Sequence, residues 1–143
     1  MKNSMFLTFL CAIFVLIGQN AFAQSLDGSY GSSPRWGSSW LELRQPTTFE
    51  SGTCLHFVIS DGASKILIRF LRVDDDPNQP VGLYDGIHEV PESREIVVML
   101  SRQFANIKQI SIHGNPKAWH YDLGGNNGPA ILETITIVAC QNQ

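Results

Sequence analysis

The alternation of apolar and polar side chains along the chain predicts strands rather than helices. Residues 65–73 (KILIRFLRV) alternate with a period of two, and residues 54–60 (CLHFVIS) are rich in β-forming side chains. No stretch keeps an apolar helical period over the length of a stable helix, so only one helical turn is expected, at residues 101–106. The expected strands are 40–44, 54–60, 65–73, 87–90, 95–101, 107–113 and 130–140.

The links between these segments decide the expected fold. Asp61-Gly62 between two apolar runs is typical of a tight turn and predicts that residues 54–60 and 65–73 form an antiparallel hairpin. Short strands without intervening helices favour an all-β fold, an antiparallel β-sandwich or jelly roll of about seven or eight strands. The side chains expected in its core are Trp40, Leu43, Leu55, Phe57, Ile59, Ile66, Ile68, Phe70, Val97, Met99, Ile110, Ile112, Leu132 and Ile135.

The N-terminal region reads as a leader followed by an arm. Lys2, the apolar run from Met5 to Ile17 and the small residues of Ala21-Phe22-Ala23 are typical of a secretory signal peptide, so residues 1–23 are expected to be removed. The run is too short for a retained membrane span, which needs about 20 residues. Residues 24–38 are rich in Ser and Gly and predict a flexible arm, which leaves residues 39–143 as the β-sandwich domain.

Charge and cysteine content narrow the class of protein. The whole chain has a net charge of −3, and losing Lys2 brings the mature chain to about −4, without a basic stripe. Nucleic acid and anionic membranes are therefore poor partners. Cys54 and Cys140 are the two cysteines left in a chain sent to an oxidising compartment, so a disulfide is expected, with two buried free thiols as the alternative. A secreted or periplasmic location follows.

Three stretches together resemble a known superfamily: residues 40–44 (WLELR), 109–114 (QISIHG) and 123–132 (LGGNNGPAIL). They are similar to the galactose-binding-like jelly rolls, which include carbohydrate-binding modules and discoidin-like domains. The resemblance implies first and last strands that lie close together. It also implies a ligand such as a sugar, a lipid headgroup or a protein, bound through loops at one end of the sandwich, and in many members a structural calcium ion.

The best candidate for a ligand site is the aromatic and polar loop of residues 114–129, which we call the Trp119 loop. A sugar needs an exposed aromatic platform beside amide, imidazole or carboxylate partners. The alternative is that Trp119 and Tyr121 plug one end of the sandwich while Asn126-Asn127-Gly128 forms a turn. The candidate ligand-binding residues are His113, Asn115, Trp119, His120, Tyr121, Asn126 and Asn127.

Two weaker candidates concern a metal and catalysis. Asp74, Asp75, Asp76 and Asn78 offer oxygen ligands for a structural Ca²⁺, but consecutive acids do not all face one centre, and a solvated acidic turn is the alternative. No motif of a metalloprotease or serine hydrolase accompanies the four histidines. A small hydrolase using His113 and His120 is therefore only an alternative.

We therefore expect a secreted binding module without catalytic activity, which recognises a carbohydrate or another surface ligand through the Trp119 loop with help from residues 74–85. The other class to consider is a structural or protein-interaction domain of the cell envelope. In that case the aromatic residues of the arm, Tyr30 and Trp36 beside Arg35, would be the contact site. The alternative is that the arm folds over a sheet edge and shields it from pairing with another chain.

Overall fold

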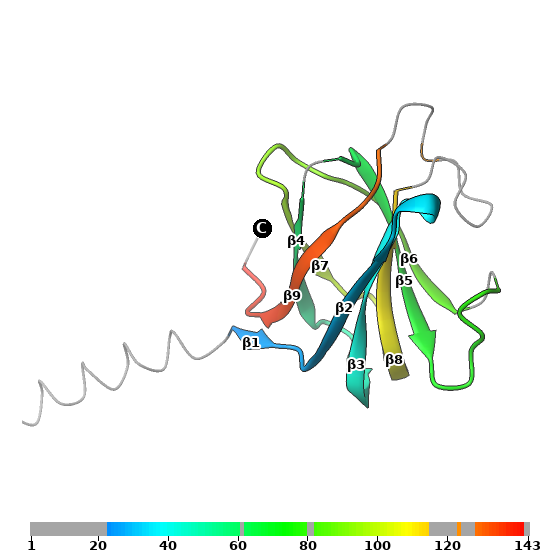
Figure 1. Cartoon of the computed structure of the whole chain (residues 1–143). Helices are drawn as coiled ribbons and strands as arrows, with labels where there is room; N and C mark the ends of the chain where they lie inside the picture. The colour runs from blue at the N-terminus through cyan, green and yellow to red at the C-terminus, as the bar shows by residue number, and fades with distance from the viewer. Residues whose placement is uncertain (1–22, 61, 80–81, 115–122, 124–127, 142–143) are drawn as a thin grey trace, which may run out of the picture.

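The computed structural model describes residues 23–141 except 61, 80–81, 115–122 and 124–127, and over this part the chain is a β-sandwich (Figure 1). A four-stranded sheet has the order β1-β9-β4-β7, and a five-stranded sheet has the order β2-β3-β8-β5-β6. Every pairing is antiparallel. The elements are β1 (Gln24–Ser25), β2 (Gly28–Ser33), η1 (Pro34–Trp36), β3 (Ser38–Phe49), β4 (Cys54–Ile59), β5 (Lys65–Arg72), β6 (Leu83–Glu89), β7 (Glu95–Met99), β8 (Phe104–His113) and β9 (Leu132–Val138).

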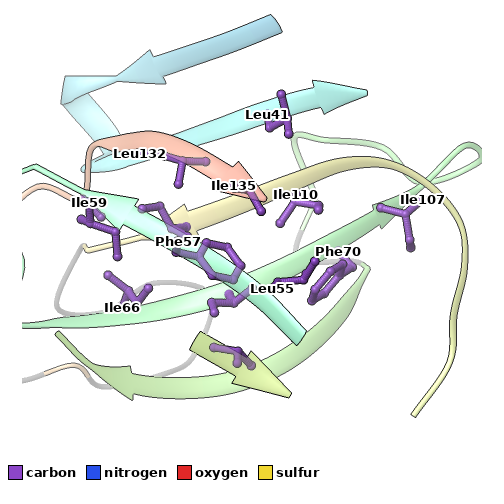
Figure 2. Packing of buried hydrophobic residues seen from close by; sticks show 14 of the residues in the cluster. Leu41, Leu55, Phe57, Ile59, Ile66, Phe70, Ile107, Ile110, Leu132 and Ile135 are labelled. Atoms are coloured by element: carbon purple, nitrogen blue, oxygen red, sulfur yellow. The ribbon is translucent and has the colours of Figure 1, made fainter. Parts of the chain in front are cut away.

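The core lies between the two sheets. Leu55, Phe57 and Ile59 of β4 face inward from one sheet, and Ile66, Ile68 and Phe70 of β5 face inward from the other. Figure 2 labels all of these side chains except Ile68. All six side chains are buried, as the alternation in their segments predicts. At one end of the core, the Phe70 ring stacks on Phe104 with centroids 4.2 Å apart and meets Phe49 edge-on at 6.2 Å.

The prediction that β4 and β5 form a hairpin is wrong. The two strands belong to different sheets, so the link from Ser60 to Ser64 crosses the sandwich instead of turning back within one sheet. β4 pairs instead with β7 and β9, and β5 pairs with β6 and β8. The physical reason is that both strands carry an apolar row, and placing these rows face to face buries both of them.

The strand β7 shows the opposite face to the one expected. Val97 and Met99 were expected in the core, but they are 48% and 65% exposed, while Val98 is buried and Ile96 packs against the core. The segment Ile96-Val97-Val98-Met99 is apolar at both parities, so its pattern cannot decide which face turns inward. Trp40 was also misplaced: it is half-buried on the outward face of β3, and its neighbour Leu41 lies in the core.

The segment expected as a flexible arm forms structure instead. β1 pairs with β9 and β2 pairs with β3 along its whole length, so residues 24–38 belong to the sandwich. The glycines that suggested flexibility allow close packing, because a Cβ at Gly31 would collide with the Trp40 ring on the neighbouring strand. The Tyr30 hydroxyl accepts a hydrogen bond of 2.9 Å from the Ile135 amide and thereby links the two sheets.

Two local expectations also need correction. The strand expected at residues 40–44 does not end before Pro46: β3 continues through it to Phe49, with a shift of register against β8. The helical turn expected at residues 101–106 is absent, because β8 already begins at Phe104. Among the described residues, no helix is long and apolar enough to cross a membrane.

The disulfide between Cys54 and Cys140 is present, as expected. Cys54 begins β4, and Cys140 follows β9, the strand beside it in the sheet. The two Cα atoms lie 5.4 Å apart, and the bridge joins positions separated by 86 residues. It therefore closes a loop that contains most of the sandwich.

We expect reduction of this bridge to lower the free energy of unfolding by about 4 kcal/mol, because the closed loop restricts the unfolded chain. Urea denaturation with and without reductant measures the loss. The matched control is the double variant Cys54→Ala/Cys140→Ala, whose stability should not respond to reductant. A wild-type midpoint that reductant leaves unchanged would contradict the prediction.

Candidate functional site

Four connections meet at one end of the sandwich, which we call the loop end and which lies at the top of Figure 1. Pairing of Ser38 with His113, of Lys65 with Glu89 and of Ile59 with Leu132 brings the corresponding strand ends there. The connections are residues 34–37, 60–64, 90–94 and 114–131. The opposite end carries the described residues 73–79 and 82. Whether residues 74–85 assist the Trp119 loop stays a prediction, because residues 115–122 and 124–127 lie outside the described part of the chain.

Both flanks of the Trp119 loop are held by a single carbonyl group. The amides of Gly114 and Ala130 donate to the Gly37 oxygen at 2.8 and 3.1 Å. Gly37 itself has a φ of 58°, a left-handed conformation that favours glycine. The loop therefore leaves the sandwich directly beside η1, the short helix that precedes Gly37.

A further contact fixes the loop from the other sheet. The Ala63 amide donates to the Pro129 oxygen at 2.9 Å, and Gly62 approaches this carbonyl so closely that a Cβ would collide with it. Gly62 also has a φ of 143°, so glycine is required there for two reasons. The link that crosses between the sheets thus supports the end of the loop.

The short helix η1 carries Trp36, an aromatic side chain that is exposed to solvent at the loop end. Trp36 is 60% exposed, and the Arg35 guanidinium lies 5.1 Å from the centroid of its ring. Such a cation–π contact orients the indole and keeps a positive charge beside it. The pair offers a flat apolar face next to a hydrogen-bond donor, which is the combination that recognises a sugar ring or an anionic group.

His113 lies beneath the start of the loop, on the outward face of the five-stranded sheet. It is the last residue of β8, and its Nε2 is 3.0 Å from the Ser111 hydroxyl, two positions earlier on the same face. Both side chains are buried. Burial, and then the charge of Arg69, lower the pKa of His113 to about 4, so the ring is neutral at physiological pH.

Leu123 shows where the described part of the loop meets the sheet. Its side chain is 2% exposed and packs with Leu67 and Tyr84 on the outward face of the five-stranded sheet. Leu67 pairs with His113 across the strands, so this anchor lies beside the buried imidazole. The other candidates, Asn115, Trp119, His120, Tyr121, Asn126 and Asn127, lie outside the described residues.

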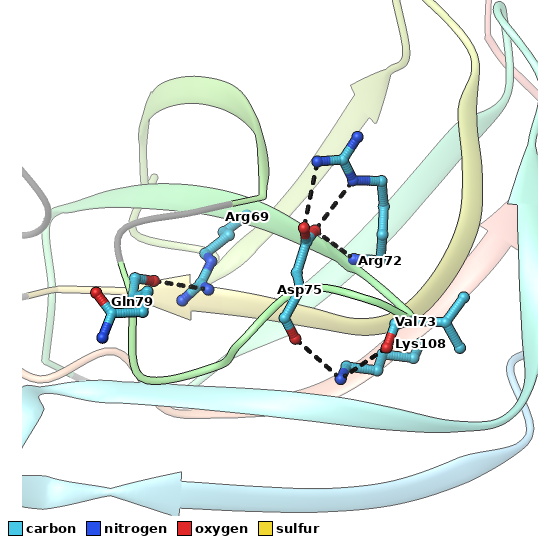
Figure 3. A network of polar contacts seen from close by, with 6 residues as sticks. All are labelled: Arg69, Arg72, Val73, Asp75, Gln79 and Lys108. Carbon is cyan, nitrogen blue, oxygen red and sulfur yellow. Dashed lines mark hydrogen bonds and ion pairs between the residues drawn. The ribbon is translucent and has the colours of Figure 1, made fainter.

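The acidic residues considered as a metal site lie in the loop at the opposite end, where Asp75 bonds to its neighbours (Figure 3). Asp75 forms an ion pair with Arg72 at 3.1 Å, and hydrogen bonds from Arg72 lower the pKa of the Asp75 carboxyl. The Asp76 carboxylate accepts from the Asn78 amide at 2.9 Å. Within the described residues, no three His, Cys, Asp or Glu side chains are grouped as metal ligands. The geometry shows these carboxylates bonded to their own loop.

A buried arginine completes the attachment of this loop. Arg69 is 2% exposed and donates to the Gln79 oxygen at 3.1 Å and to the Pro77 oxygen at 3.4 Å. Lys108 adds bonds to the oxygens of Val73 and Asp75. Because Arg69 also contributes to the depressed pKa of His113, residues 73–82 and the loop end are linked through the outward face of one sheet.

The chain matches no family model, no curated protein and no solved structure. The resemblance to the galactose-binding-like jelly rolls therefore stays a prediction at the level of the superfamily, while the sandwich architecture is shown. Two features of the site were missed in the sequence. Ser111 could have been found, because residues two apart on a strand share a face, whereas Leu123 gave no signal within a Gly-rich stretch.

The buried imidazole predicts a specific loss of stability on acidification. The pKa of His113 is about 4 in the folded state and about 6.5 when unfolded, so the unfolded state binds more protons between these values. The free energy of unfolding should fall by about 3 kcal/mol as the pH is lowered from 6.5 to 4. His113→Gln should lose this component.

Urea denaturation across that pH range measures the effect. His56→Gln is the matched control, because His56 lies on the outward face of the other sheet, 3.1 Å from Glu95, and its replacement leaves the His113 component in place. Equal pH slopes for the wild type and His113→Gln would refute the assignment.

Proposed function

We propose that the protein is a secreted or periplasmic binding module without catalytic activity, and that it recognises a carbohydrate or a similar surface ligand at the loop end. The observation that carries the proposal is the exposed Trp36 with Arg35 over its ring, beside the carbonyl that holds both flanks of the Trp119 loop. An aromatic face with polar neighbours suits the C–H faces and hydroxyl edges of a sugar.

Two further points support this proposal. A structural disulfide such as Cys54–Cys140 is typical of proteins that work in an oxidising compartment, in agreement with the leader expected at residues 1–23. The stretches 40–44, 109–114 and 123–132 resemble the galactose-binding-like jelly rolls, in which ligands commonly bind at loops at one end of the sandwich. We infer the same location here, with residues of the Trp119 loop completing the surface that Trp36 begins.

The proposal predicts that Trp36→Ala weakens binding to a glycan at least tenfold, about 1.4 kcal/mol, because an exposed aromatic platform contributes mainly to the ligand. The melting temperature should change little, since the indole is 60% exposed. A broad glycan array identifies the ligand, and titration of the intrinsic Trp fluorescence measures its affinity. Trp119→Ala should show the same loss.

The matched control is Val73→Ala at the opposite end, which removes an exposed apolar side chain without touching the loop end. Its affinity should equal that of the wild type. A glycan that binds Trp36→Ala as tightly as the wild type would exclude this platform, and an array without any bound glycan would exclude the carbohydrate class.

One observation favours a second function, hydrolysis by Ser111 activated by His113, because their side chains lie within hydrogen-bond distance. The serine is 3% exposed and the histidine 7%, so neither side chain is open to a substrate in this conformation. Ser111→Ala should abolish turnover of ester substrates and leave glycan binding unchanged. Turnover that persists in this variant would reject the pair as the catalytic group.

A further inference from the structure

The strand β7 is a free edge of the four-stranded sheet. It pairs with β4 on one side, and no described strand pairs with its other side. Two of the other sheet edges have features that limit pairing. β1 has two residues, and β6 has a register shift beside Gly86, whose φ is 106°. β7 has none of these features.

The backbone of β7 presents alternate residues to this free side. The Leu100 amide donates to the Thr53 oxygen, and the strands continue in register through Val98 with Leu55 and Ile96 with Phe57. Antiparallel pairs alternate between bonded and unbonded types, so these pairs are the bonded ones. The N–H and C=O groups of Glu95, Val97 and Met99 therefore point away from β4.

The side chains along this edge are also suited to a contact. Val97 and Met99 are exposed on the outward face, at 48% and 65%. A groove of about 410 Å³ lies between the strand and the end of β6, with a mixed lining: His88 and Glu89 are polar, and Val90, Pro91, Ile96, Val97 and Val98 are apolar. A strand laid along β7 would thus gain backbone hydrogen bonds and apolar contacts together.

We propose that a second copy of this chain pairs with β7, through its own β7, about a two-fold axis at Val97. The strand is self-complementary in this register. Val97 meets Val97 of the second copy, and each Glu95 lies opposite a Met99, so no like charges face each other. All three outward-pointing backbone groups find partners, and the apolar side chains of both copies join in one strip.

This pairing would set the direction of the two loop ends. β7 begins at the loop end and runs toward the opposite end, so antiparallel strands place the two loop ends at opposite poles of the dimer. If the proposed function holds, the dimer bridges two ligand-bearing surfaces. The dimer itself does not depend on that function, and Trp36→Ala should leave it intact.

Two lysine substitutions on the same strand test the register. Val97→Lys would place two ammonium groups opposite each other and should raise the dimer dissociation constant at least tenfold. Met99→Lys would place an ammonium group opposite Glu95 and should leave the constant unchanged or lower it. Light scattering after size-exclusion chromatography of the mature, oxidised chain measures both. Ile87→Lys on the edge strand β6 is the matched control and should dimerise like the wild type.

A second measurement requires no substitution and therefore does not depend on the folding of a variant. Amide exchange of Glu95, Val97 and Met99 should slow as the protein concentration rises, while exchange in β6 stays constant. A chain that is monomeric at every accessible concentration would overturn the proposal. A dimer that tolerates Val97→Lys, or one that Met99→Lys weakens equally, would overturn it as well.

Discussion

The core depends on the burial of two apolar rows that are adjacent in the sequence but belong to different sheets. Leu55, Phe57 and Ile59 of β4 face Ile66, Ile68 and Phe70 of β5, and each of these side chains contributes about 1.5–3 kcal/mol when it is buried. A hairpin would put both rows on one face of one sheet. The crossing at residues 60–64 lets them cover each other, and it also brings Gly62 beneath the end of the Trp119 loop.

The two ends of the sandwich differ in the roles of their charged and aromatic side chains. At the end that carries residues 73–82, charged side chains bond to the loop itself, as Arg69 does to Gln79 and Arg72 to Asp75. At the loop end, backbone bonds to Gly37 and Pro129 and the bonds of the Arg94 guanidinium to the Ser60 oxygen hold the connections, whereas Trp36 and Arg35 stay exposed. Side chains that are not needed to fix a loop are available to a ligand, which is why the proposal places the site there.

Much of the fold could be predicted from the sequence, and each failure has a local cause. Alternation predicted the inward rows of β4 and β5, because a strand with one polar and one apolar face can bury only the apolar face. It failed for β7, which is apolar on both faces. In β9 the register skips Glu133, so Leu132 and Ile135 both point inward, as expected, despite their odd spacing. The Ser- and Gly-rich arm was misread because small residues also serve strands that pack closely. Of the candidate site, the sequence pointed to His113 and to the aromatic loop, but the carbonyl of Gly37 that joins this loop to Trp36 has no sequence signature.

The ambiguity of β7 follows from its position in the sheet. An interior strand of this sandwich shows one face to the core and the other to solvent, as β4 does with the polar side chain of His56 outward. In β7 the outward-facing side chains are Val97 and Met99, which are apolar. β7 is also the edge of its sheet, so some of its backbone groups are exposed as well. Exposed apolar side chains beside unpaired backbone groups favour association between chains. The β7 strand of a second copy would cover the apolar side chains and bond to the free backbone groups. The apolar residues on both faces of β7, which made its inward face impossible to predict, are then the residues that form the proposed interface.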